Sequence, residues 1–213
     1  MRIYLFDLDG TLVDSMPAFI RCVLGILEET GTSYEGDVIR AVTPLGVQGT
    51  ADYFVKIGVP LSREEIIQRI GVHLLDEYTN RIPAKTHVRE VLELLHQQGS
   101  RLFVLSASPH IVLDPCLCRL GLYDRFEAVW SCDDFGLKKD DERIYHRTAE
   151  HMGVPESEIL FLDDHCDAVR AAKAAGLRVC GVYDASSAEY EQEIRATADF
   201  YIRDFDELRQ RGF

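Results

Sequence analysis

Positive charge is scarce in this 213-residue sequence, which has 23 lysines and arginines against 36 aspartates and glutamates. The formal net charge is therefore -13 at pH 7. A chain with this charge repels the phosphate backbone of nucleic acids and anionic membrane surfaces, so we expect neither as a partner. An anionic small molecule is still a suitable ligand, provided that local cations offset the negative field.

Long apolar runs and paired cysteine motifs are also missing. No hydrophobic stretch is long enough to span a bilayer and no export signal precedes the first apolar run, so we expect a cytoplasmic protein. The six cysteines include no C-x-x-C pair. In a reducing compartment we expect buried free thiols, and neither a disulfide framework nor a zinc site.

Five short apolar runs recur along the chain and predict the strands of a parallel sheet. Their apolar residues are continuous and do not alternate with polar ones, as expected for strands that are buried on both faces. A helical pattern follows each run, and this alternation predicts an α/β fold with a Rossmann-like, doubly wound parallel sheet. The five runs are residues 3–6, 102–105, 127–130, 159–162 and 179–182.

Several residues mark the ends of the predicted core helices. Ser108 and Pro109 have the pattern of an N-cap followed by proline at the first helical position. Gly99 and Gly176 stand where a helix commonly ends in a left-handed residue.

The segment from residue 15 to residue 84 breaks the alternation of strand and helix. It has no convincing strand, but apolar residues at helical spacing run from Phe19 to Leu27 and from Ile66 to Tyr78. Ser62 and Glu65 form a capping box at the start of the second stripe. A segment of this length is too long for an ordinary connection. We therefore expect a small helical cap domain at 15–84, inserted into an α/β core made of 1–14 and 85–213.

Polar residues follow the predicted strands at the sheet edge where open α/β folds bind ligands. Several carboxylates at one edge fit a hard cation such as Mg²⁺, because that ion prefers oxygen ligands. A lysine and a hydroxyl beside the ion suit a phosphoryl group. The residues concerned are Asp7 and Asp9 after the first run, Ser106 after the second, Lys138 and Lys139 after the third, and Asp163 and Asp164 after the fourth.

In these motifs the chain resembles the haloacid dehalogenase superfamily, specifically the members with a helical cap inserted after the first strand. The pattern Asp-x-Asp-Gly-Thr at 7–11 carries the resemblance. Ser106, the lysine loop and the segment "LDDHCDAVRAAKAAG" at 162–176 supply the remaining motifs in the expected order. The resemblance extends over essentially the whole chain. It is greatest to the phosphoglycolate phosphatase and β-phosphoglucomutase-like branch.

The resemblance implies a role for each of these residues. Asp7 would be the nucleophile that forms an aspartyl-phosphate, and Asp9 would be the general acid and then the general base. Lys139 would offset the negative charge of the phosphate. Mg²⁺ would be held by Asp7, the backbone carbonyl of Asp9, Asp163 and Asp164, and the phosphate would be held by Thr11, Ser106 and Ala107.

Two of these assignments have alternatives. The lysine loop reads "KKDDERIY" and has no proline, so Lys138 could take the place of Lys139, although Lys139 aligns better when counted back from Tyr145. The second acidic residue of the metal site could be Asp167, in which case Asp164 would be the N-cap of the following helix.

The expected function is a Mg²⁺-dependent phosphatase of a small phosphorylated metabolite, either phosphoglycolate-like or a sugar phosphate. A phosphomutase is the close alternative, but it would need cap cations for a second phosphate, and the cap segment "VTPLGVQGT" at 42–50 is nearly uncharged. A non-catalytic phosphate-binding regulator is less favoured because all four motifs are present. The sequence leaves the oligomeric state and the physiological substrate open.

Overall fold

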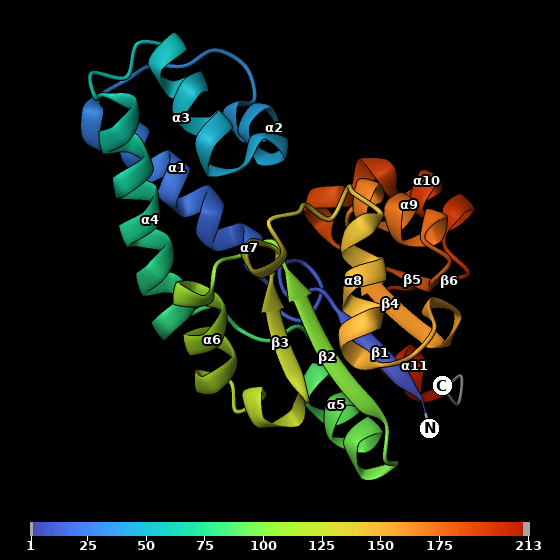
Figure 1. Cartoon of the computed structure of the whole chain (residues 1–213). Coiled ribbons are helices and arrows are strands. Elements are labelled where there is room, and N and C mark those ends of the chain that lie inside the picture. Colours follow the sequence, from blue (N-terminus) through green and yellow to red (C-terminus); the bar gives the residue numbers. More distant parts are fainter. Residues whose placement is uncertain (1, 211–213) are drawn as a thin grey trace. The chain divides into compact units, whose positions relative to one another are not determined.

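The computed structural model describes residues 2–210, and the chain divides into two compact units (Figure 1). One unit comprises Met1–Asp14 and Pro83–Phe213, and the other comprises Ser15–Ile82. Among the described residues, no helix is both long enough and apolar enough to cross a membrane.

The larger unit is built on one sheet of six parallel strands in the order β3-β2-β1-β4-β5-β6. β1 is central, with Ile3 in register with Arg101 on one side and with Ile159 on the other. The strand order reverses beside β1, which confirms the predicted doubly wound fold. The strands are β1 (Ile3–Phe6), β2 (Arg101–Ser106), β3 (Ala128–Ser131), β4 (Ile159–Asp163), β5 (Arg178–Val182) and β6 (Phe200–Ile202), the last of which was not predicted.

Helices cover both faces of this sheet, with α8, α9 and α10 on one face and α5 and α11 on the other (Figure 1). The helices are α5 (Val88–Gln97), α6 (His110–Arg119), α7 (Cys132–Phe135), α8 (Arg143–Met152), α9 (Cys166–Ala174), α10 (Glu191–Thr197) and α11 (Asp206–Gln210). Short 3-10 turns lie at Tyr123–Arg125, Glu156–Glu158 and Ala185–Tyr190.

The predicted helix ends are correct at two positions and wrong at one. Gly99 and Gly176 follow α5 and α9 with φ of 74° and 92°, as predicted. The N-cap of α6, however, is Pro109 and not Ser108. The physical reason is that the Ser108 hydroxyl donates to Asp9 and its backbone N–H donates to Ser106 Oγ, so Ser108 is part of the loop.

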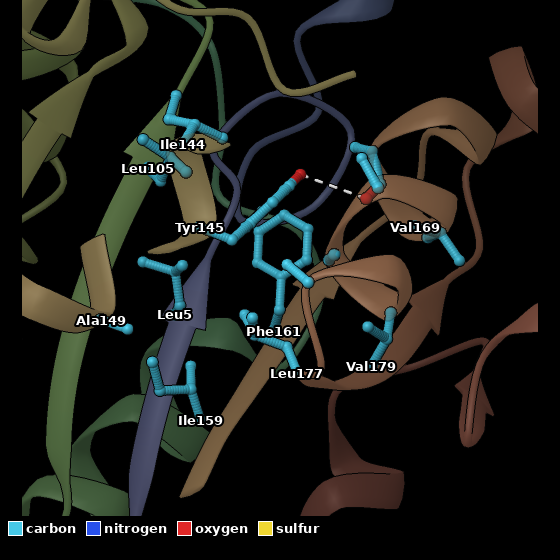
Figure 2. Close-up of a cluster of buried hydrophobic side chains, with 14 of the residues drawn as sticks. Leu5, Leu105, Ile144, Tyr145, Ala149, Ile159, Phe161, Val169, Leu177 and Val179 are labelled. Atoms are coloured by element: carbon cyan, nitrogen blue, oxygen red, sulfur yellow. Dashed lines mark hydrogen bonds between the residues drawn. The ribbon is translucent and has the colours of Figure 1, made fainter. Parts of the chain in front are cut away.

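One packed cluster connects the sheet to the loop that carries the candidate lysine. Figure 2 shows the Tyr145 ring from α8 beside Phe161 of β4, with the ring centroids 5.1 Å apart. The Tyr145 hydroxyl lies 2.9 Å from the carbonyl oxygen of Lys139 and 3.1 Å from that of Ala168. Because Tyr145 is fully buried, these contacts fix the lysine loop against the sheet.

The smaller unit contains only helices among its described elements. They are α1 (Met16–Thr30), α2 (Val38–Val42), α3 (Gly46–Lys56) and α4 (Arg63–Asn80), with a 3-10 turn at Thr43–Leu45. Side chains from all four helices form its core, which includes Val23, Val42, Phe54 and Ile70. The capping box predicted at Ser62 and Glu65 is present at the start of α4.

Candidate active site

The chain leaves β1 in a tight turn that carries Asp7 and Asp9. The Asp7 N–H donates to the Leu162 carbonyl at 2.9 Å, which continues the pairing of β1 with β4 and buries Asp7. The turn is closed by the Gly10 N–H, which donates to the Val13 carbonyl at 3.0 Å. Gly10 has a φ of 77°, a left-handed conformation that glycine adopts readily.

The loop after β2 reaches Asp9 through Ser108, which the sequence predicted only as a helix N-cap. Ser108 Oγ donates to Asp9 Oδ2 at 2.7 Å, and the Ser108 N–H donates to Ser106 Oγ at 2.9 Å. Ser106 is fully buried, whereas Ala107 is exposed. In the sequence, the one indication of this role is that Ser108 lies two positions after Ser106 in the segment "LSASPH".

The structure places Asp164, and not Asp167, beside the other carboxylates. Asp164 is buried, and its Oδ1 accepts a hydrogen bond of 3.1 Å from the hydroxyl of Thr11. Asp167 is exposed on α9 and pairs with Arg170 at 2.8 Å. The N-cap of α9 is His165, so Asp164 does not cap this helix.

Of the two candidate lysines, too, one contacts the carboxylates and the other is exposed. Lys139 Nζ donates to Asp7 Oδ1 and, at 2.8 Å, to Asp163 Oδ2. Lys138 is exposed. The geometry therefore brings Lys139 to the first aspartate of the motif and leaves Lys138 at the surface.

Burial and mutual repulsion raise the pKa values of two carboxylates in this cluster. Burial, with the charges of Asp163 and Asp9, raises the pKa of Asp7 to about 8, although Lys139 opposes the shift. Burial and the charges of Asp163 and Asp7 also raise the pKa of Asp164. Burial lowers the pKa of Lys139, but Asp163 and Asp7 outweigh that effect and raise it, so the lysine is cationic.

The donor set of the cluster fits a divalent metal ion. Asp7, Asp163 and Asp164 each offer one carboxylate oxygen, and these oxygens all lie within 4.8 Å of one another. When all three carboxylates are ionised, they and the ammonium of Lys139 leave an excess of two negative charges, which a divalent cation would balance. An all-oxygen set is the kind that Mg²⁺ prefers. The Asp9 side chain lies outside this trio and contacts Ser108. The resemblance assigned only the backbone carbonyl of Asp9 to the metal, and that assignment stays a prediction.

Residues 4–182 match the family model described as haloacid dehalogenase-like hydrolase. The chain belongs to this family. The match spans all of the candidate residues named above, and it confirms the expected family and its hydrolase class.

Curated relatives are similar to the chain in sequence, and solved structures share its fold. The chain is 27% identical over 177 residues to hexitol phosphatase B of Escherichia coli (strain K12), covering 82% of this chain and 80% of that protein. It is 27% identical over 189 residues to a phosphoglycolate phosphatase of Pseudomonas fluorescens (strain Pf0-1), covering 85% of this chain and 69% of that protein.

A predicted phosphoglycolate phosphatase from Haemophilus somnus shares the fold with a TM-score of 0.83 at 21% identity, covering 100% of this chain and 98% of that one. A putative β-phosphoglucomutase from Thermotoga maritima also shares the fold, with a TM-score of 0.81 at 22% identity, covering 97% of this chain and 96% of that one.

Proposed function

We propose that this chain is a Mg²⁺-dependent phosphatase that hydrolyses a small phosphorylated metabolite through an aspartyl-phosphate. The observation that carries the proposal is the contact of Lys139 with Asp7 and Asp163 inside a buried carboxylate cluster. The names of the relatives support a hexitol phosphate or phosphoglycolate as the substrate.

Asp7 is the proposed nucleophile. One of its carboxylate oxygens forms a bond to phosphorus while the bond from phosphorus to the alcohol oxygen of the substrate breaks. Lys139 lowers the repulsion between the carboxylate and the anionic phosphate, because its ammonium contacts Asp7 directly. When bound by Asp7, Asp163, Asp164 and the Asp9 carbonyl, Mg²⁺ would supply further charge neutralisation to the phosphoryl oxygens.

Asp9 is the proposed acid and base. In its protonated form it gives a proton to the departing alkoxide, and as a carboxylate it then takes a proton from the water that attacks the aspartyl-phosphate. The Ser108 hydroxyl holds one carboxylate oxygen of Asp9 and thereby sets the orientation of the group. We therefore add Ser108 to the site as a positioning residue.

The phosphate oxygens are assigned to the loop after β2. Ser106 Oγ accepts from the Ser108 N–H, which leaves the Ser106 hydroxyl proton for a phosphate oxygen. The backbone N–H of Ala107 is proposed as a second donor. Thr11 was expected to bind the phosphate too, but its hydroxyl donates to Asp164, so we assign it to the positioning of Asp164.

The direct test is phosphate release from a panel of phosphorylated metabolites in the presence of Mg²⁺. The panel includes phosphoglycolate, hexitol phosphates and sugar phosphates, and Asp7→Asn is the comparison variant. We expect release by the wild type, none by Asp7→Asn, and a phosphoryl group on Asp7 detectable by mass spectrometry after rapid quenching. Phosphate binding without release would favour the regulator, and release by Asp7→Asn at the wild-type rate would remove Asp7 from the mechanism.

Asp14→Asn is the matched control, because Asp14 follows the same turn and its side chain is exposed. This variant should release phosphate at the wild-type rate. A loss as large as that of Asp7→Asn would mean that any change of charge near the turn is damaging.

A further inference from the structure

A second lysine contacts the turn that carries Asp9. Lys85 Nζ lies 2.6 Å from the Gly10 carbonyl oxygen, 2.5 Å from the Tyr183 carbonyl oxygen and 3.1 Å from Asp184 Oδ2. An ammonium has three N–H donors, and here each of them has an acceptor. The side chain is only 18% exposed. Its donors are therefore used within the protein, so Lys85 is not a ligand for the substrate phosphate.

The backbone of Lys85 holds the same turn. The Lys85 N–H donates to the Leu12 carbonyl at 3.0 Å, and the Asp14 N–H donates to the Pro83 carbonyl at 3.0 Å. Residues 83–85 thus run beside residues 12–14, and the side chain of Lys85 reaches back to Gly10. This one segment therefore contacts the turn after Asp7 both at Gly10 and at residues 12–14.

Asp184 keeps the lysine in place. It is buried, and its Oδ1 accepts hydrogen bonds from the Ser186 N–H at 2.9 Å and from the Ser186 hydroxyl at 2.6 Å. Its other oxygen, Oδ2, is the one that Lys85 contacts. The carboxylate therefore cannot turn away from Lys85 without losing these bonds.

The Gly10 peptide is held between Lys85 and the carboxylate cluster. Its carbonyl oxygen faces Lys85, while a β-carbon built on its α-carbon would lie 2.5 Å from Asp164 Oδ2. This carbonyl belongs to the peptide that joins Gly10 to Thr11, so a rotation of that peptide would move both the Gly10 α-carbon beside Asp164 and the Thr11 hydroxyl that donates to Asp164 Oδ1. We propose that Lys85 is a positioning residue, which through the Gly10 carbonyl holds Asp164 and the turn that carries Asp9 where the reaction needs them.

This inference rests on the proposed phosphatase activity and adds to it a residue that touches no reacting atom. Loss of the Lys85 ammonium would free the Gly10 carbonyl. Displacements of about 1 Å in an active site can cost about 10²-fold in rate, and loss of groups that orient metal ligands costs about 10- to 100-fold. We expect Lys85→Met to lower kcat by about 10- to 100-fold with little change in KM.

The experiment compares Lys85→Met, Asp184→Asn and the double variant, each for kcat, KM and melting temperature. Lys85→Met leaves the buried charge of Asp184 unpaired and should lower the melting temperature. The double variant removes that charge, so it should recover the melting temperature but not kcat. Asp184→Asn alone keeps an amide oxygen beside Lys85 and the contacts of Lys85 with the two carbonyls, so it should lower kcat far less than Lys85→Met does.

Lys173→Met is the matched control, because Lys173 also pairs with an aspartate of the same unit, with Nζ 2.8 Å from both oxygens of Asp199. It should lower stability without lowering kcat. Recovery of kcat together with melting temperature in the double variant would overturn the proposal, and so would a loss confined to KM. A wild type that hydrolyses none of the phosphate esters would instead refute the proposed function.

Discussion

Gly10 lies directly against the carboxylate of Asp164. A methyl group built on Gly10 would stand 2.5 Å from Oδ2 and 2.7 Å from Oδ1 of that aspartate, closer than real β-carbons approach other atoms. The position also has a φ of 77°. Two separate requirements, the left-handed backbone and the close approach, thus both call for glycine after Asp9.

Gly10→Ala should therefore have a larger effect than the free-energy cost of its left-handed backbone conformation alone, because it should also lower kcat. The left-handed conformation alone costs about 1–2 kcal/mol for a residue with a β-carbon. Gly153→Ala measures that cost by itself, since Gly153 has a φ of 69° and nothing within 4 Å of the added methyl group. We expect both variants to be less stable in denaturant titrations, and only Gly10→Ala to lose about 10²-fold in kcat. Wild-type kcat in Gly10→Ala would show that the contact with Asp164 is not needed.

The two adjacent lysines should differ sharply in function. Lys139→Met removes the ammonium that contacts Asp7 and Asp163, and loss of one such charge-stabilising group typically costs about 10²–10³-fold in kcat. Lys138→Met changes an exposed side chain and should leave kcat unchanged. Steady-state phosphate release measures both variants, and circular dichroism checks that they fold. An equal loss in the two variants would contradict the assignment of Lys139.

Asp164 and Asp167 should be separable by their effect on the Mg²⁺ requirement. Asp164→Asn removes one of three clustered carboxylates, so the Mg²⁺ concentration for half-maximal activity should rise by about 10- to 100-fold. Asp167→Asn disrupts only an exposed pair with Arg170 and should leave that concentration unchanged. A Mg²⁺ titration of phosphate release gives the answer. The reverse ranking of the two variants would place Asp167 at the metal.

The sheet could be predicted from the sequence because each main strand is a continuous apolar run. All residues of β1 and of β4 are buried. A strand buried on both faces consists of consecutive apolar residues, and this pattern is visible in the sequence. β6 has only the three residues Phe200–Ile202, too few to stand out from a helix segment. The motif aspartates could be selected for a similar reason, because they directly follow a buried strand.

The contacts that orient these aspartates could not be predicted. Ser108 meets Asp9 across 99 positions of the chain, Lys85 meets Gly10 across 75, and Thr11 meets Asp164 across 153. A serine or threonine hydroxyl donates to whatever acceptor the fold brings near, so residue type alone does not specify the partner. The same holds for the choice between Lys138 and Lys139, which depends on how Tyr145 fixes the loop.

His110 should make stability depend on pH. Its Nδ1 and Nε2 lie 2.9 Å from Asp114 and 2.9 Å from Asp134, and these hydrogen bonds raise the pKa of His110. Both ring nitrogens can donate only in the protonated form. Since the folded pKa exceeds the unfolded value of about 6.5, the stabilisation is complete below that pH and is lost as pH rises through the folded pKa.

Denaturant midpoints measured on either side of neutrality test this dependence. The difference between wild type and His110→Gln should be largest at acidic pH and should shrink as pH rises. His96→Gln, at an exposed position of α5, is the control and should follow the wild-type pH profile. A difference between wild type and His110→Gln that is the same at every pH would show that the two carboxylates do not hold a proton on the histidine.

Ion pairs within the smaller unit bear on the choice between phosphatase and phosphomutase. A mutase has to hold the second phosphate of a bisphosphate, which calls for additional cationic side chains. Several arginines of residues 15–82 are already paired with carboxylates of the same unit. The pairs are Arg21–Glu77 at 2.7 Å, Arg63–Asp52 at 2.6 Å, Arg69–Glu29 at 2.8 Å and Arg81–Glu77 at 2.8 Å.

We therefore expect release of inorganic phosphate from a monophosphate, with no dependence on a bisphosphate activator. Incubation with β-glucose 1-phosphate, with and without a trace of the 1,6-bisphosphate, separates the two reactions. In a phosphatase, water reaches the phosphorylated Asp7 and the activator changes nothing. In a mutase, a second hydroxyl has to take the phosphoryl group before water does, so glucose 6-phosphate would accumulate faster than phosphate and only when the activator is present. That second pattern, found with wild type and absent with Asp7→Asn, would keep the proposed nucleophile and replace the phosphatase by a phosphomutase.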